Sequence, residues 1–348
     1  MFRKISGCII VLTCLTMSMC GYRQKGIGAS DTIYVFSDEE TRQIVGSAID
    51  TTFSFGYRSP EFIKFFKTVW KHFDSFPDIA RFKNLIIVAD LNKIDLGVKI
   101  AKGILPPEKY HLAEQDSIFI YAIDDVWVDG QMVVVIAGKD LKRMNRNILE
   151  QKGWLYEKFN QKFEQTEKAD IYSKGEQKKM SRTLWKKYKW TLRIQHDYVI
   201  IRESNLRKFV WIGRGYPYRW LSVSWENGIK TEWLTANGLF EKRQQIGKYY
   251  QDTETDKRFL GTYFTQFGEW NALRMSGLWY RTKEAKGGPF VTYAFYDSKT
   301  DRTFVIDIVL FDPGANSSIL LRQVEIIAET FTTKMTDTYY DDVSEYGK

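Results

Sequence analysis

The chain has 348 residues, and its 51 Lys and Arg residues outnumber 43 Asp and Glu residues, for a formal net charge of +8. Its three cysteines, Cys8, Cys14 and Cys20, all lie at the N-terminus, so the rest of the chain is not a small disulfide-stapled domain. The three histidines are isolated and no serine-nucleophile motif is present, which excludes the common zinc and serine-hydrolase templates.

Residues 1–19 have the three parts of a secretory signal peptide. Arg3 and Lys4 supply the positive region, and the apolar stretch that follows runs for about 11 residues, too short for a bilayer core that needs roughly 20. A buried N-terminal helix or strand is the alternative. We expect cleavage before Cys20 and attachment of lipid (palmitate) to its thiol, although Met19 stands where Gly or Ala is usual. The protein is expected to be located in the cell envelope, in the outer membrane on its periplasmic or surface face.

The signal is followed by a Gly-rich stretch, residues 20–30, which we expect to be a flexible tether. Residues 31–175 are then predicted to form an N-terminal α+β half. Ser37 and Glu40 form a capping box that predicts the start of a helix. Asp129-Gly130 is a two-residue hairpin signal. Strands are predicted at 31–36, 84–89, 118–123 and 132–136, and a long charged helix at 141–168.

The remainder of the chain is predicted to form a C-terminal α+β half, residues 190–335. Strands are predicted at 190–194, 198–201, 208–212, 220–225, 290–296 and 303–311, and helices at 231–250 and 317–331. The acidic tail, residues 336–348, is expected to be disordered.

Residues 118–159 and 289–330 align without a gap, and both have the pattern strand, turn, strand, loop, helix. Identical positions include Ile148/Ile319 and Leu149/Leu320, so we expect these pairs to pack on their sheets in the same way. The predicted fold class is therefore α+β, with antiparallel sheets and packed helices, and an internal duplication that gives two similar halves is one interpretation of the pattern.

Several motifs of the C-terminal half resemble one family. They are Gly277–Tyr280, Gly287–Val291, Asp297, Arg322–Ile327 and Thr330. This set is similar to the signature of the bacterial envelope lipoproteins catalogued as domain of unknown function 4837, and weaker similarity extends over nearly the whole mature chain. Ser276 and Lys286 depart from the pattern, where Arg and Met are usual. The resemblance implies a lipoprotein signal and a shared fold, but it implies no activity.

The loop Gly287-Gly288-Pro289-Phe290 has two interpretations. It is either a ligand-clasping loop or a tight turn that enters a strand, since Gly permits unusual backbone angles and Pro cannot donate to a central ladder. Trp279 is likewise either an aromatic platform for a sugar or peptide, or a core side chain.

No metal, cofactor or catalytic residue is predicted. A calcium loop at Asp124–Gly130 is rejected because Val126 and Val128 interrupt the alternate oxygen ligands that calcium needs. Nucleotide-binding glycine motifs lack their third glycine. Paired carboxylates for glycoside hydrolysis stay open, because sequence does not give the separation between acidic side chains.

A basic segment links the two predicted halves. It interleaves Trp185, Tyr188 and Trp190 with the cations Lys178, Lys179, Arg182, Lys186, Lys187 and Lys189. Export argues against nucleic acid as its partner. The segment is therefore either a solvated linker or a patch that contacts an anionic membrane surface.

These observations favour a non-enzymatic, lipid-anchored envelope protein that acts as a binding or assembly module. The expected partners are the membrane, through the N-terminal lipid, and another envelope protein or a glycan, with no nucleic acid. The alternative is an envelope hydrolase that acts on glycan or peptide through paired carboxylates at the junction of the halves.

Overall fold

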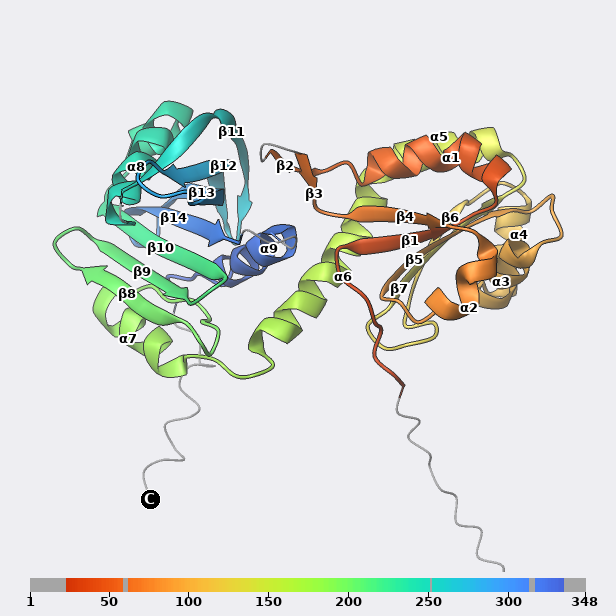
Figure 1. The fold of residues 1–348 in the computed structure, drawn as a ribbon, viewed down its shortest axis with the longest axis horizontal. Helices are drawn as coiled ribbons and strands as arrows, with labels where there is room; N and C mark the ends of the chain where they lie inside the picture. Colours follow the sequence, from red (N-terminus) through yellow and green to blue (C-terminus); the bar gives the residue numbers. More distant parts are fainter. Residues whose placement is uncertain (1–22, 59–61, 251, 313–316, 335–348) are drawn as a thin grey trace, which may run out of the picture.

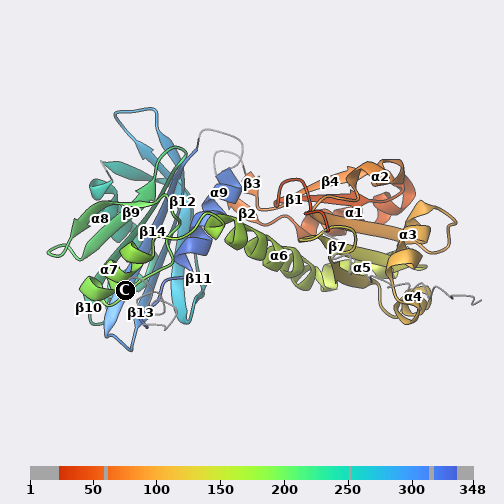
Figure 2. The ribbon, with the colours of Figure 1, turned by 90° about the horizontal axis from the view of Figure 1, so that it is seen from below.

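The computed structural model describes residues 23–58, 62–250, 252–312 and 317–334. The predicted signal peptide, Cys20 and the tail 336–348 lie outside the described residues. Figure 1 shows an N-terminal and a C-terminal lobe, each built on its own sheet. Helix α6 (Lys152–Tyr172) runs between the lobes, as the view from below also shows (Figure 2). The α+β fold class is confirmed. Within the described ranges, every helix is too short or too polar to cross a membrane.

The N-terminal sheet is mixed rather than antiparallel. Its order is β4-β1-β5-β7-β6, and only the β6–β7 pair is antiparallel. The strands are β1 (Thr32–Phe36), β4 (Lys67–Lys71), β5 (Asn84–Asp90), β6 (Ile120–Asp124) and β7 (Met132–Gly138). Every residue of β5 and β7 is buried, which is typical of parallel strands that helices cover on both faces. This sheet therefore departs from the antiparallel pairing expected from the sequence.

Helices cover both faces of the N-terminal sheet (Figure 1). One face carries α1 (Glu39–Thr52) and α5 (Leu141–Glu150). The other carries η1 (Phe73–Ser75), α2 (Phe76–Ile79), α3 (Leu96–Ile104) and α4 (Pro107–Glu114). The cap of α1 is Asp38, whose carboxylate accepts from Thr41 N at 3.0 Å, and not the predicted Ser37. A small hairpin, β2 (Gly56–Arg58) and β3 (Phe62–Lys64), extends toward the other lobe (Figure 1).

The predicted hairpin between β6 and β7 forms, but its connection is residues 125–131 and not a two-residue turn. Asp125 closes this loop, because its Oδ1 accepts from Gly130 N at 2.7 Å and from Gln131 N at 3.0 Å. Lys162 Nζ lies 2.7 Å from Asp124 Oδ1. These carboxylates thus have partners within the fold, and among the described residues no group of three or more His, Cys, Asp or Glu side chains is arranged to hold a metal.

The C-terminal sheet has seven antiparallel strands in the order β11-β12-β13-β14-β10-β9-β8. They are β8 (Val199–Ser204), β9 (Phe209–Arg214), β10 (Tyr218–Asn227), β11 (Thr253–Phe267), β12 (Trp270–Arg281), β13 (Gly287–Asp297) and β14 (Arg302–Phe311). One face packs on α8 (Ala236–Tyr249), which follows η2 (Thr231–Leu234). The other packs on α7 (Lys178–Tyr188) and α9 (Ser317–Ala328). The sequence did not predict β11 and β12, and the predicted strand 190–194 is an extended segment that only bridges Thr332.

Residues 23–30 are not a free tether. Gly26 N donates to Asp129 O at 2.8 Å, and Ile27 N donates to Arg81 O at 3.0 Å. The Gln24 carbonyl accepts from Asp129 N at 2.9 Å. The described start of the chain is therefore bonded to the N-terminal lobe, because its backbone groups find partners on two neighbouring loops.

The lobes meet where α9 packs on α6. The Arg322 guanidinium lies 3.4 Å from the ring centroid of Phe163 and donates to Asn160 Oδ1 at 2.5 Å. Gln323 Nε2 donates to Glu167 Oε2 at 2.5 Å. Arg322 and Gln323 belong to the family-like motif Arg322–Ile327, so this motif forms the contact between the lobes.

The duplication predicted from residues 118–159 and 289–330 holds only for local shape. Each segment forms a hairpin followed by a helix, but one hairpin belongs to a mixed sheet and the other to an antiparallel sheet. The helix faces also differ. Ile148 is fully buried whereas Leu149 is 40% exposed, and Leu321 rather than Leu320 is buried on the second helix. The expectation that Leu149 packs on its sheet is wrong, because α5 turns that position toward solvent.

Candidate functional site

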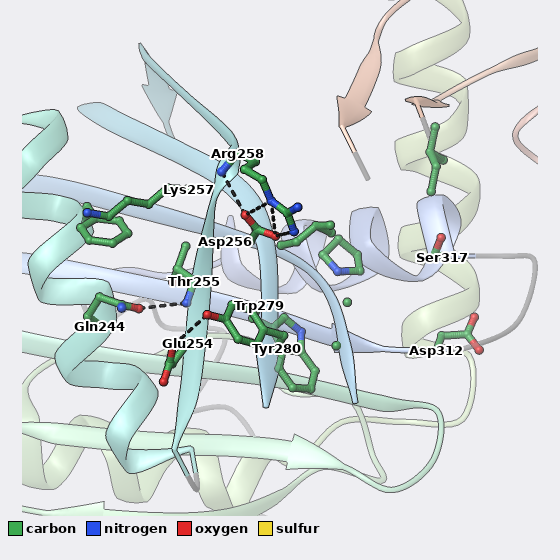
Figure 3. Close-up of a pocket in the computed structure, with 16 residues that line it drawn as sticks. Gln244, Glu254, Thr255, Asp256, Lys257, Arg258, Trp279, Tyr280, Asp312 and Ser317 are labelled. Carbon is green, nitrogen blue, oxygen red and sulfur yellow. Dashed lines mark hydrogen bonds and ion pairs between the residues drawn. The ribbon is translucent and has the colours of Figure 1, made fainter. Parts of the chain in front are cut away.

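A cavity of about 1020 Å³ lies beside the edge of the C-terminal sheet, at the ends of β11, β12 and β13 (Figure 3). Gln244 and Phe240 of α8 form one wall. Ile63 of β3 and Ser317 of α9 lie on the opposite side, so the cavity opens toward the hairpin of the N-terminal lobe. It therefore gathers residues from both lobes.

The rim of this cavity exists because β11 bulges. Asp256 pairs with Leu278 and Gly261 pairs with Ser276, so residues 257–260 have no register partner on β12. Such a bulge re-aims the side chains that it carries. Lys257 and Arg258 lie on the bulge, and both are exposed and line the cavity.

The candidate loop and Trp279 form the floor of the cavity, with Gly287, Gly288 and Pro289 in its lining. Trp279 is 1% exposed and donates from Nε1 to Leu310 O at 2.9 Å, so it packs as a core side chain. A Cβ on Gly288 would lie 2.2 Å from Leu310 O, which shows that glycine is needed for close backbone approach. Phe290 is fully buried and does not line the cavity.

The acidic side chains at the cavity are engaged by neighbours. Arg258 Nη2 lies 2.6 Å from Asp256 Oδ2, and its hydrogen bonds lower the pKa of Asp256. Glu254 Oε2 accepts from Tyr280 OH at 2.8 Å, which raises the pKa of that phenol. The Lys257 ammonium lies 4.7 Å from the ring centroid of Phe240. A carboxyl with a lowered pKa is a poor general acid, so Asp256 is not suited to donate a proton.

Two smaller cavities, of about 580 and 230 Å³, lie at the α6–α9 junction and share Glu164 and Glu329 in their linings. Glu325 accepts from Arg274 Nη2 at 2.9 Å and from Tyr293 OH at 2.8 Å. Part of Glu329 is exposed to solvent, yet burial, with Glu325 and Glu164 next, raises its pKa to about 7. This junction thus holds a carboxyl that is partly protonated at neutral pH.

The predicted basic segment is a helix and not a linker. Lys178, Lys179, Arg182, Lys186 and Lys187 lie on α7, and Lys189 ends it in the left-handed conformation at φ 56°. The interleaved Tyr188 and Trp190 are 6% and 1% exposed, so their role is core packing.

The residues of β11 and α8 that line the main cavity were not predicted as site residues from the sequence. In β11, buried Thr253 and Thr255 alternate with exposed Glu254, a period-two signal that short polar side chains conceal. Gln244 reaches the same strand, because its Oε1 accepts from Thr255 N at 3.0 Å.

One family model matches part of the chain, and the solved structures that resemble it have low sequence identity and low TM-scores. No curated protein matches the chain. A solved structure from Bacteroides thetaiotaomicron is 7% identical, and the match covers 42% of this chain and 45% of that one, with a TM-score of 0.26. The Saccharomyces cerevisiae Ran-binding protein Mog1p is 8% identical, with 41% and 89% covered and a TM-score of 0.29. LpqN, involved in cell envelope biogenesis of Mycobacterium tuberculosis, is 13% identical, with 41% and 82% covered and a TM-score of 0.27.

The family model described as Domain of unknown function (DUF4837) matches residues 176–330. This range runs from just before α7 to just after α9, and it includes the family-like motifs Gly287–Val291 and Arg322–Ile327. The match over residues 176–330 supports a DUF4837-like family for this part of the chain.

Proposed function

We propose that this chain is a lipid-anchored envelope protein that binds a glycan or a peptide in the cavity beside β11. The observation that carries the binding role is the cavity itself. Its volume of about 1020 Å³ is at the upper end of the range for small-molecule sites. Its lining mixes apolar side chains with a larger number of polar and charged ones, as a glycan or peptide site requires. Lys257 and Arg258 supply hydrogen-bond donors at its rim, and Phe240 and Pro289 supply apolar surface.

Replacing both Lys257 and Arg258 by alanine should weaken binding by about 10- to 100-fold, since a hydrogen bond to a charged group contributes roughly 1.5–3 kcal/mol. The measurement is titration of the fluorescently labelled protein against envelope oligosaccharides and oligopeptides. The matched control replaces two exposed cations of α5, Lys142 and Arg146, and should bind as the wild type does. Equal affinities for all three proteins would contradict the proposed site.

In the hydrolase alternative, the reaction would take place at the α6–α9 junction and not in the main cavity. Glu329, with a pKa of about 7, lies in the range that a general acid needs, and Glu164 lines the same cavities beside Tyr156 and Tyr263. Incubation of the same oligosaccharides and oligopeptides with the protein separates the two functions. Fragments that form with the wild type and not with Glu329→Gln would establish hydrolysis, whereas intact ligands support binding alone.

Anchoring at Cys20 is proposed from the signal-like residues 1–19 and from the family resemblance. After a high-salt wash that screens electrostatic contacts, the variant Cys20→Ser should leave the membrane fraction and become soluble, because one thiol would carry all the lipid. Metabolic labelling with a fatty acid should mark the wild type and not the variant. Label that persists in Cys20→Ser would place the lipid on another residue.

A further inference from the structure

The solvent face of α7 carries only positive charge. Lys178, Lys179, Arg182 and Lys186 follow at helical spacing, and Lys189 continues the face past the end of the helix. No acidic residue occurs between positions 178 and 189. The opposite face, with Leu184 and Tyr188, is buried in the C-terminal lobe. The apolar face of the helix is therefore buried in the protein, and the solvent side presents mainly positive charge, with the half-buried Trp185 beside it.

Among the described residues, the two acids nearest to α7 are paired with cations other than Lys179, Arg182 and Lys186. Glu203 pairs with Lys187 at 2.8 Å and also accepts from Tyr188 OH. Glu176 pairs with Arg193 at 2.5 Å. Since each of these carboxylates is engaged at the base of the helix, the cations Lys179, Arg182 and Lys186 keep their charge toward solvent.

The first described residues are hydrogen-bonded to the N-terminal lobe, which limits the distance between this lobe and Cys20. Arg23 Nη1 donates to Asp125 O at 2.5 Å, and Gln24 O accepts from Asp129 N at 2.9 Å. Three residue steps separate Cys20 from Arg23, a reach of about 10 Å at full extension. A lipid on Cys20 would thus hold the lobe close to the headgroups, at a distance comparable to the Debye length of about 8 Å in physiological salt.

The first described residues and α7 lie on the same side of the molecule, the lower side in Figure 1, although they belong to different lobes. We propose that this side docks on an anionic lipid surface, with α7 as the second contact beside the lipid of Cys20. Both lobes then face the membrane along one side. The lipid contact rests on the proposed anchoring at Cys20, whereas the charge of α7 is independent of it.

The test measures vesicle binding without the lipid, so that it stands apart from acylation and from the cavity. The mature chain carrying Cys20→Ser is sedimented with phosphatidylcholine vesicles that contain or lack phosphatidylglycerol. It should bind only the anionic vesicles, and salt should release it. Reversing three charges, K179E with R182E and K186E, should weaken binding by at least about 100-fold, because each lost cation alone contributes about fivefold and each new carboxylate is repelled by the anionic surface.

The matched control makes the same charge change at three exposed cations of α5 and the start of α6, in K142E with R146E and K152E. Helix α5 lies on the upper side in Figure 1. The control should keep most of the binding. An equal loss in both triple variants, or no binding of the parent chain to anionic vesicles, would overturn the proposal.

A second readout reports orientation in the acylated protein. The chain has no cysteine after Cys20, so a single fluorophore can be placed at T183C on α7 or at R146C on α5. Headgroup quenchers in the vesicle should quench the first label and spare the second. Equal quenching would overturn the orientation, and a failure of the protein to insert would instead count against the proposed anchor.

Discussion

Replacing Asp307 by alanine should lower the free energy of unfolding of the C-terminal lobe by about 3–5 kcal/mol, the usual cost of leaving a buried charge without its partner. Asp307 Oδ1 lies 3.1 Å from Arg243 Nε, and both side chains are 0% exposed. Thr292 Oγ1 also donates to Asp307 Oδ1, at 2.5 Å. The Arg243 guanidinium also lies 4.6 Å from the ring centroid of Phe290, and the ion pair that it forms among the described residues is the one with Asp307. Urea unfolding followed by tryptophan fluorescence measures the loss.

The double variant Arg243→Met with Asp307→Val is the control for this prediction. Apolar residues that replace both members of a buried ion pair are often neutral for stability, so the double variant should recover most of the lost free energy. Asp307→Asn, which keeps the shape and one acceptor, serves if the alanine variant does not fold. A double variant as unstable as the single one would show that cavity formation, and not the orphaned charge, causes the loss.

Trp279→Ala should destabilise the same lobe by about 3–5 kcal/mol, the range for a buried tryptophan. The indole is 1% exposed and lies 6.2 Å from the ring centroids of Trp220 and Phe311. Its loss would also leave the Leu310 carbonyl without its donor. The change would therefore remove packing and a hydrogen bond at the floor of the candidate cavity.

The adjacent residue provides the matched control. Tyr280 is 38% exposed and bonds only at the surface, to Glu254, so Tyr280→Ala should cost less than about 1 kcal/mol. Thermal melts and urea titrations of both variants give the comparison. If Trp279→Ala were as stable as Tyr280→Ala, the indole would not be part of the core, and its role as a binding platform would need to be reconsidered.

Most of the individual elements followed from the sequence, because each depends on residues close together in the chain. The β-branched run at 84–89 became β5, and the apolar periodicity at 317–331 became α9. The strand at 220–225 became the centre of β10. The family-like motifs could also be recognised in the sequence, and the family model matches residues 176–330, the range in which they lie.

Pairing and exposure were decided by the tertiary structure. A buried apolar strand has the same local pattern whether its neighbour is parallel or antiparallel, so the mixed N-terminal sheet was not predicted. Leu149 and Ile148 are adjacent apolar residues, and only the placement of α5 buries one and exposes the other. The pattern shared with residues 289–330 therefore described local shape without similar packing.

The candidate cavity depends on tertiary structure even more strongly. Its walls come from positions 63, 240–258, 278–289 and 317, which become neighbours only when β11 pairs with β12 and the hairpin β2–β3 reaches the other lobe. The sequence by itself determined most of the strands and helices, the position of the basic segment and the motifs that resemble the family. The tertiary structure alone decided which side chains share a cavity and which carboxylates already have partners, because contacts between distant segments depend on the packing of the whole chain and leave no local periodicity.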